Sequence, residues 1–283
     1  MEIRKDSPMD DYRIIKYPRT PHIEGSRLQP GDEDLSQIPF AEIADLPLVI
    51  EEKIDGANSA LSFDPAGQLL LQSRGHYLTG GYREKHYQLF KQWAGIHREA
   101  FWQVLGCRYV MYGEWMYAKH SIFYDALPHY FMEFDILDRE SGQFLSTDRR
   151  HQMLKDLPVC SVPVLARGCF HKAADVLSYL GDSCYITENH LDNLRAATEK
   201  EGQDVERSLR ETDAARTMEG LYLKVEEDGQ VTRRVKFVRS SFLQTVEQSQ
   251  SHWLERPIIP NQLCRPIGDL YLPQLPKEEP HDR

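Results

Sequence analysis

Short runs in which apolar and polar residues alternate recur along the chain and predict antiparallel strands. The first group joins LPLVIEEKIDG to the runs SALSFD and QLLLQSRG, which a Pro-Ala-Gly turn separates. The second group contains RYVMYGEWMY, then HYFMEFDILD and, after a RESG turn, QFL. The third group, EGLYLKVE and QVTRRVKFVR, is divided by Asp228-Gly229, a strong hairpin signal. Three hairpin-like units are therefore expected.

Two longer stretches have the residue spacing of amphipathic helices. One runs from about Arg83 to Leu105, and the other runs from about Asp148 to Arg216. The last part of the second stretch is so rich in charged residues that we expect it to form a solvated helix face. Antiparallel sheets with helices packed outside them predict an α+β fold.

Proline and turn-forming residues distinguish both ends of the chain. Residues 1–45, which include KYPRTPHIEGSRLQPGDEDL, predict an arm or lid rather than a separate core. Residues 246–283 contain six prolines and predict a short tail, which Trp253 is expected to anchor. One main domain is therefore expected over residues 46–245, with a helical insertion at about residues 148–216.

The composition of the chain is that of an ordinary globular protein. Its 283 residues are 41% hydrophobic and 28% charged. No apolar run approaches the ~18 residues of a membrane span, and the first residues lack the apolar segment of a signal peptide. The five cysteines contain no CxxC pair, which disfavours a disulfide framework or a cysteine-rich zinc site. We therefore expect a cytoplasmic protein.

The charge of the chain is acidic overall but basic in places. The formal net charge is −10, which argues against nonspecific coating of DNA. However, the stretch from Arg74 to His120 holds seven Lys and Arg residues against three Asp and Glu residues, and Val231 to Arg239 holds four basic residues and no acid. A local groove for nucleic acid thus remains compatible with the acidic total.

The sharpest local feature is Lys53-Ile54-Asp55-Gly56-Ala57-Asn58, directly after an apolar run. A lysine at the end of a buried strand lies in a partly desolvated pocket, where desolvation and nearby cations would lower the pKa of its amine and make it a nucleophile. Asp55 would orient the ammonium group, and Gly56 would let a ligand approach the backbone. The alternative is a surface lysine in a turn.

Several further positions have chemistry that would serve such a lysine. Arg74 closes the second strand of the next hairpin and suits phosphate or ribose, while Glu114 is a carboxylate on an otherwise apolar strand. Phe134 would stack on a purine, and Glu219 would help to hold a divalent cation. Plainer alternatives are a surface arginine, a core phenylalanine and a capping or edge-strand acid. Two cations on one strand face complete the set, against the alternative of a solvated edge: Arg234 and Lys236.

The order of these motifs resembles that of the covalent nucleotidyltransferases, which comprise ATP-dependent RNA and DNA ligases and mRNA capping enzymes. GEWMYAKHSIFYDALPHYFMEFDILD and RVKFVRSSF look most like the RNA ligase branch, related to the phage RNA ligase 2 family. The resemblance covers roughly residues 45–245 and implies an ATP-grasp-like nucleotidyltransferase domain of antiparallel sheets flanked by helices.

The resemblance implies an ATP-dependent RNA ligase that joins 3′-hydroxyl and 5′-phosphate ends. The Lys53 amine would take AMP from ATP, the AMP would pass to the 5′-phosphate of RNA, and the 3′-hydroxyl would then expel it. Mg²⁺ or Mn²⁺ would assist, with Glu219 organising the metal. Lys53, Arg234 and Lys236 would be catalytic, and the implied nucleotide-binding residues are Glu52, Asn58, Arg74, Glu114, Phe134 and Glu219.

Two departures from the family pattern bear on this expectation. The last motif usually has two lysines, whereas here the first of the two is Arg234, which clamps phosphate but does not give up a proton. In addition, the 44 residues after Arg239 are too few for the OB-fold domain of DNA ligases and capping enzymes. Without such a domain, the residues that bind RNA are not identified. The stretch from Arg74 to His120 is the candidate surface. A separate end-healing kinase or phosphatase is the candidate partner in RNA repair.

Three classes of function remain open from the residues alone. The leading one is an RNA ligase. The second is an enzyme with the same covalent chemistry that acts on DNA ends or uses GTP, as capping enzymes do. The third is a non-catalytic module that binds nucleotide or RNA.

Overall fold

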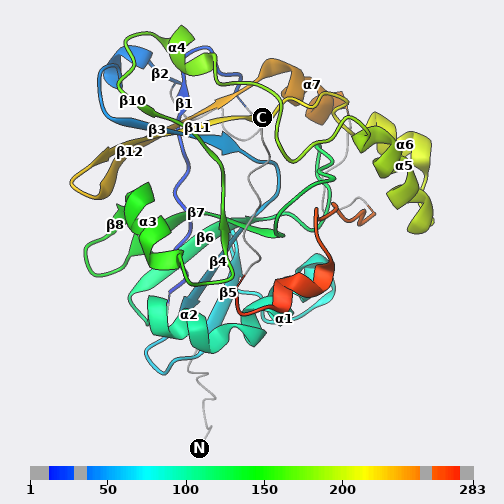
Figure 1. Cartoon of the computed structure of the whole chain (residues 1–283), viewed down its shortest axis with the longest axis horizontal. Coiled ribbons are helices and arrows are strands. Elements are labelled where there is room, and N and C mark those ends of the chain that lie inside the picture. Colours follow the sequence, from blue (N-terminus) through cyan, green and yellow to red (C-terminus); the bar gives the residue numbers. More distant parts are fainter. Residues whose placement is uncertain (1–12, 29–36, 249–256, 275–283) are drawn as a thin grey trace, which may run out of the picture.

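The three predicted hairpin units form one mixed sheet that is folded into two facing halves (Figure 1). The computed structural model describes residues 13–28, 37–248 and 257–274. Within these ranges the strand order is β10-β3-β11-β12-β8-β7-β6-β4-β5, and β1, β2 and β9 pair beside this path. Most neighbouring strands are antiparallel, as the alternation of residues predicted.

The first half of the sheet is built on the strand that carries Lys53. It consists of β1 (His22–Ile23), β2 (Gln37–Ile38), β3 (Leu48–Lys53), β10 (Val164–Gly168), β11 (Gly220–Glu227) and β12 (Gln230–Val238). Its apolar residues form a core with the 3₁₀ turn η2 (Phe40–Glu42) and the short helix α4 (Ala173–Leu177). Part of the N-terminal arm therefore belongs to this core.

The second half of the sheet carries the other motif strands and the larger core. It consists of β4 (Ala57–Phe63), β5 (Leu69–Ser73), β6 (Tyr109–Trp115), β7 (Phe131–Asp138) and the short β9 (Cys160–Ser161). Helices α1 (Gln88–Ile96) and α2 (Arg98–Leu105), which follow the 3₁₀ helix η3 (Tyr82–Tyr87), cover its outer face (Figure 1). Phe90, Trp93 and Phe101 supply the fully buried rings of this layer.

Among the described strands of the main path, the short strand β8 (Gln143–Leu145) pairs with both halves. On one side it pairs with β12 at Gln230 and Val231, and on the other side it pairs with β7 at Leu137 and Asp138. The ladder between the halves is therefore confined to the end of the sheet near the β11–β12 turn. Away from that end the two halves face each other.

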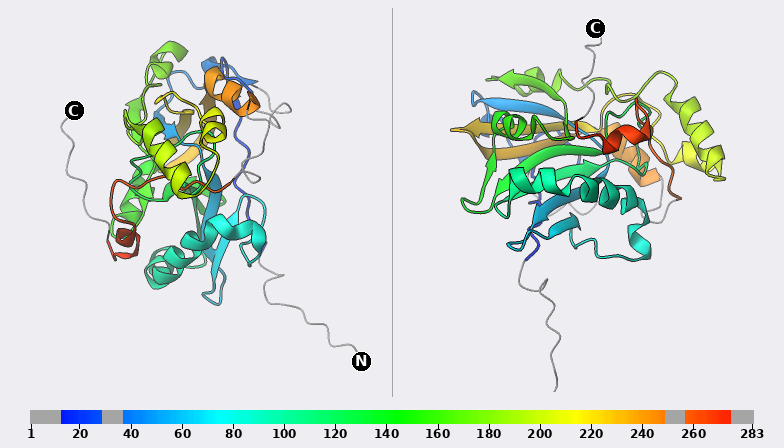
Figure 2. Two further views of the ribbon diagram at one scale, coloured as in Figure 1. Left: turned by 90° about the vertical axis from the view of Figure 1, so that its right-hand side faces the viewer. Right: turned by 60° about the horizontal axis from the view of Figure 1, so that its bottom comes forward.

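One predicted element is wrong in its middle. The stretch expected to be helical over residues 148–216 contains α3 (Thr147–Leu154), α4, α5 (His190–Lys200) and α6 (Val205–Arg210), but β9 and β10 interrupt it. The sequence there, CSVPVLARG, combines β-branched valines with a proline, which favour an extended chain over a helix. Helices α5 and α6 lie together at one side of the molecule (Figure 2).

The described part of the tail is packed onto the main core. Helix α7 (Ser240–Gln248) follows β12, and the 3₁₀ turn η5 (Ile267–Tyr271) buries Leu270. The Asn261 side chain donates to Met116 O (2.7 Å) and accepts from Tyr124 N (3.0 Å). Trp253 lies outside the described residues, and within them all named strands belong to the one sheet, so no OB-fold is present there. No described helix has both the length and the apolarity to cross a membrane.

Candidate active site

A cavity of about 740 Å³, which includes the solvent at its mouth, lies between the two halves of the sheet. Strands β3, β4, β6, β7, β11 and β12 and the N-terminal arm all contribute to its wall. The predicted site residues that line it are Glu52, Lys53, Asn58, Arg74, Glu114, Phe134 and Lys236.

Lys53 is the last residue of β3 and points its amine at Glu219. The Nζ atom lies 2.7 Å from both carboxylate oxygens of Glu219. This contact follows from strand register, because Lys53 pairs with Gly220 at the start of β11 and Glu219 directly precedes it. Gly220 is required there, since a Cβ atom would lie 1.9 Å from the backbone oxygen of Phe237. The Glu-Gly motif therefore brings a carboxylate to the lysine.

The pKa of Lys53 is shifted in the direction opposite to the one expected. Burial lowers the pKa of the amine, as predicted, but the carboxylates of Glu219 and Glu114 outweigh it and raise the pKa above its usual value. The nearby charges are anions, whereas the expectation assumed cations. Lys53 is therefore an ammonium ion in the nucleotide-free protein, and it needs to lose a proton before it attacks phosphorus.

Glu114 is a half-buried carboxylate close enough to Lys53 for their charges to interact. Burial is the main cause that raises its pKa, to about 8, while Lys53 acts in the opposite direction. Its Oε2 atom is buried and has no hydrogen-bond partner among the described residues. Asn58 lies beside it, because the two residues are paired across β4 and β6. A buried carboxylate oxygen without a hydrogen-bond partner is suited to bind a ligand hydroxyl group or a cation.

The pair of Glu219 and Glu114 also bears on where a divalent cation would bind. Within the described ranges no group of three or more His, Cys, Asp or Glu side chains is arranged to hold a metal ion. Mg²⁺ commonly takes one or two carboxylates and completes its shell with water and substrate phosphates. The residues present therefore fit a cation that arrives with a polyphosphate rather than one held by the protein alone.

Asp55 and Gly56 have roles that differ from the expected ones. The Asp55 carboxylate accepts hydrogen bonds from the backbone N–H groups of Ser121 (2.7 Å) and Ile122 (2.9 Å), so it holds that loop, and its charge adds a smaller effect that raises the pKa of Lys53. A Cβ atom on Gly56 would lie 2.9 Å from Glu114 Cγ and 2.5 Å from the Met116 sulfur. Gly56 thus makes room for the β6 side chains rather than for a ligand.

Three aromatic rings form one end of the cavity. Phe134 on β7 is half-buried, and the Tyr17 ring meets it edge-on with 5.0 Å between centroids. The Tyr17 hydroxyl donates to Asp135 (2.5 Å) and contacts the Tyr222 hydroxyl (2.8 Å), which in turn contacts Thr20 Oγ (2.5 Å). Phe134 is therefore held in a fixed orientation beside the cavity.

The structure separates the two cations of the last motif. Lys236 lines the cavity, whereas the Arg234 guanidinium lies over the Phe144 ring (3.7 Å) and 5.4 Å from the centroid of Tyr17. Residues two apart share a strand face but are displaced by ~6.6 Å along it. That displacement places Arg234 against Tyr17 and outside the cavity lining, whereas Lys236 is part of that lining.

Glu52 lies in the wall of the cavity next to Lys53. It is 2% exposed, and burial raises the pKa of its carboxyl to about 7, against a smaller opposite effect from a hydrogen bond with Ser183. Its Oε1 atom has no hydrogen-bond partner within the described residues. Glu52 is therefore partly protonated near neutral pH.

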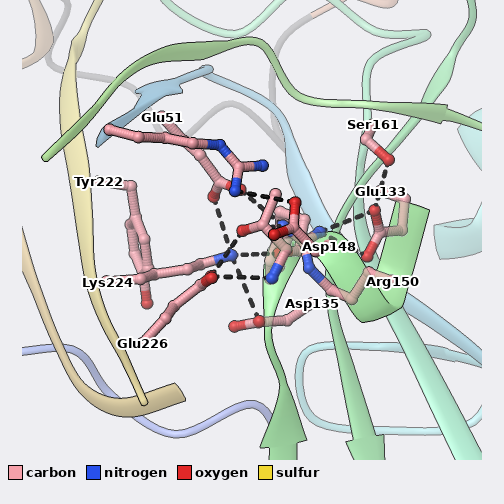
Figure 3. Close-up of polar contacts among 12 residues, drawn as sticks. Glu51, Glu133, Asp135, Asp148, Arg150, Ser161, Tyr222, Lys224 and Glu226 are labelled. Atoms are coloured by element: carbon pink, nitrogen blue, oxygen red, sulfur yellow. Dashed lines mark hydrogen bonds and ion pairs between the residues drawn. The ribbon is translucent and has the colours of Figure 1, made fainter. Parts of the chain in front are cut away.

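A buried network of charged side chains connects the two halves beside the cavity (Figure 3). Arg150 on α3 donates to Glu51 on β3 (2.6 Å) and to both oxygens of Glu133 on β7 (2.7 and 2.8 Å). Lys224 on β11 lies 2.8 Å from Glu51 and 3.3 Å from Asp135. Burial would raise the pKa of Asp135, but the surrounding cations outweigh it and lower that pKa. The network fixes β3 against β7.

Sequence reasoning missed four polar residues of the cavity wall. Tyr17 and Thr20 belong to the N-terminal arm, in which no motif of this chemistry was recognised. Tyr222 lies two residues beyond Gly220 on a strand already identified, so period-two alternation gave a usable signal. Glu51 gave no such signal, because it lies within a mainly apolar run.

Comparisons with known proteins agree with this architecture. A model of the family described as RNA ligase matches residues 46–238. No protein of curated function matches the chain.

Among solved structures, Naegleria gruberi RNA ligase with PPi is similar in fold, with a TM-score of 0.54 and 18% identity over 83% of this chain and 58% of the other. A mutant of that ligase with ATP and Mn has a TM-score of 0.52, 14% identity and coverage of 83% and 59%. Another, with AMP and Mn, has a TM-score of 0.52, 15% identity and the same coverage. The chain thus spans less than two thirds of the length of these proteins.

Proposed function

The chain belongs to the RNA ligase family, and from that premise we propose that it seals RNA ends through AMP carried covalently on Lys53. The observation that carries the proposal is the position of the Lys53 amine: it lies in the wall of the cavity, beside the carboxylates of Glu219 and Glu114. We also propose that residues 46–245 form the adenylation domain, with residues 1–45 as an arm and residues 246–283 as a tail.

In the first step the deprotonated Lys53 amine would attack the α-phosphorus of ATP. The Nζ–P bond forms, the bond from phosphorus to the bridging oxygen breaks, and pyrophosphate leaves with that electron pair. The Lys53 ammonium, whose Nζ atom lies 2.7 Å from Glu219, would first lose its proton to solvent. Because the displacement is in line, the protein mainly positions groups and balances charge.

A divalent cation, Mg²⁺ or Mn²⁺, would supply charge neutralisation at the phosphates when it is bound. Glu219 and Glu114 are the side chains that would hold it, in agreement with the orphaned oxygen of Glu114. Both carboxylates raise the pKa of Lys53. If they bound the cation, their effect on that pKa would weaken, and the amine would lose its proton more readily.

The other cavity residues have chemistry that suits the rest of the nucleotide. Phe134 would stack on adenine, with Glu52 and the nearby Tyr222 completing the base site. Glu114 and Asn58 would meet the ribose, Arg74 would bind ribose or phosphate, and Lys236 would hold the α-phosphate. Arg234 would act at a distance, by fixing Tyr17.

In the second and third steps the AMP would pass to an RNA 5′-phosphate, and a 3′-hydroxyl would then attack that phosphate and expel AMP. The substrate ends must therefore carry a 5′-phosphate and a 3′-hydroxyl. Broken RNA often lacks these groups, so an end-healing kinase or phosphatase is the partner whose chemistry would supply the substrate.

Incubation with Mg²⁺ and ATP labelled at the α-phosphate, followed by a denaturing gel, tests the first step. We expect label on the wild type and on Lys155→Ala, an exposed lysine that does not line the cavity, but none on Lys53→Ala. Label from GTP but not from ATP would show that the enzyme uses GTP, and the assignment of ATP would be wrong. No label with any nucleotide would refute the enzymatic function and favour a module that only binds nucleotide or RNA.

A further inference from the structure

The N-terminal strap, defined here as residues 13–23, runs from one half of the sheet to the other, and its exposed Pro18 lines the cavity and so marks the mouth. At one end, Ile15 O accepts hydrogen bonds from Gln72 and Tyr112 in the second half (both 2.9 Å). At the other end, Pro21 O accepts from Lys236 N (3.0 Å), and His22 pairs with β12. Between these ends the strap itself lines the cavity.

The buried edge of the strap fixes its position. Tyr17 is 8% exposed and Thr20 is 6% exposed, and their hydroxyl groups are held by Asp135 and Tyr222. Because both sheet halves and the aromatic end of the cavity anchor it, the strap is a rigid part of the site rather than a free arm. It also precedes residue 46, where the family match begins.

The outer edge of the strap carries a row of cations. Arg13, Lys16 and Arg19 are exposed, and residues 13–23 contain these three basic residues and no acid, although the chain as a whole has a net charge of −10. The spacing of three matches the repeat of an extended polyproline-type chain, on which such residues share one edge. Lys16 precedes Tyr17 and Arg19 follows Pro18, and both Tyr17 and Pro18 line the cavity, as Arg74 does.

Three cations of the basic stretch between Arg74 and His120 have partners within the protein. Lys91 pairs with Glu84, and Arg108 donates to Asp138 (2.8 Å). Lys119 is 6% exposed and donates to two backbone oxygens. The strap differs from these three cations in that its residues line the cavity directly.

We propose that Arg13, Lys16 and Arg19 bind the phosphate backbone of the RNA strand whose 5′ end enters the cavity. This proposal rests on the proposed ligase function. The 5′-phosphate has to reach AMP on Lys53, so the next phosphates of that strand pass the cavity mouth, where the strap lies. Cations fixed on an anchored strap would set the position of the strand without reading its sequence.

The test is the triple variant Arg13→Gln, Lys16→Gln, Arg19→Gln in the full chain, beside a control in which Lys155, Lys172 and Lys200 are changed to Gln. The control residues are exposed, remove the same charge and do not line the cavity. Self-adenylation with ATP, sealing of a 5′-phosphate RNA and direct binding of that RNA are measured for each protein from low to high salt.

For the strap variant we expect wild-type self-adenylation, an RNA concentration for half-maximal sealing about tenfold higher at physiological salt, and a salt slope of binding smaller by about 2, since each phosphate contact on a single strand contributes ~0.7. Unchanged RNA dependence and slope, or equal effects in the control, would overturn the proposal. So would loss of self-adenylation in the strap variant alone, since the cations would then serve ATP. Failure of the wild type to adenylate would instead refute the ligase function.

Discussion

Glu52 offers a quantitative test of the electrostatics of the cavity. Its carboxyl is buried in the wall, and burial raises the pKa from 4.5 in the unfolded chain to about 7 in the folded protein. Between these values the folded protein binds more protons than the unfolded chain, so this residue makes stability fall as the pH rises through that window. Above pH 7 the full cost of an ionised, buried carboxylate is present.

The size of the effect follows from the shift in pKa. A difference of about 2.5 pKa units at 1.36 kcal/mol each corresponds to about 3 kcal/mol of lost stability at pH 8.5, and to less than about 1 kcal/mol at pH 5. Glu52→Gln keeps the shape of the side chain and is neutral at every pH. The variant should therefore be more stable than the wild type at pH 8.5 by about 3 kcal/mol, and nearly equal to it at pH 5.

Urea unfolding followed by tryptophan fluorescence at the two pH values measures this difference. Glu227→Gln, an exposed position at the end of β11, is the matched control and should change the free energy of unfolding by less than about 0.5 kcal/mol at both pH values. A Glu52→Gln variant with the same difference from wild type at both pH values, or one less stable at pH 8.5, would refute the reasoning.

Three further substitutions test the other parts of the site. Arg150→Met leaves Glu51 and Glu133 buried without their cation and should lower the free energy of unfolding by about 3–5 kcal/mol in urea titrations. Phe134→Leu should raise the ATP concentration for half-maximal self-adenylation about tenfold, because a stacked ring contributes ~1–3 kcal/mol per base. Glu219→Gln should raise the Mg²⁺ requirement about tenfold or more and shift the pH profile of adenylation to lower pH, since Glu219 raises the pKa of Lys53.

The sequence predicted the strands and the motif residues well because both depend on local patterns. Alternating residues and the Asp228-Gly229 turn defined β11 and β12 closely. Motif residues on adjacent strands, such as Asn58 and Glu114, then meet because strand register brings them together. Residues whose environment is set by neighbouring strands were therefore the most accessible to prediction.

The features that were missed depend on contacts between distant parts of the chain. Tyr17 meets Asp135 and Tyr222, which lie 118 and 205 positions further along, and no local periodicity indicates such contacts. The pKa of Lys53 depends on two carboxylates from other strands, so its direction was predicted wrongly. The contact of Arg234 with the Phe144 ring was not predicted, because that ring comes from β8.

Mapping of the covalent adduct tests the central claim most directly. After incubation with ATP and Mg²⁺, the protein is digested and its peptides are analysed by mass spectrometry for attached AMP. The account predicts one adduct, on Lys53, that is labile in acid and stable in alkali as a phosphorus–nitrogen bond is. An AMP adduct on any other residue, or its absence from a protein that still seals RNA with ATP, would contradict it.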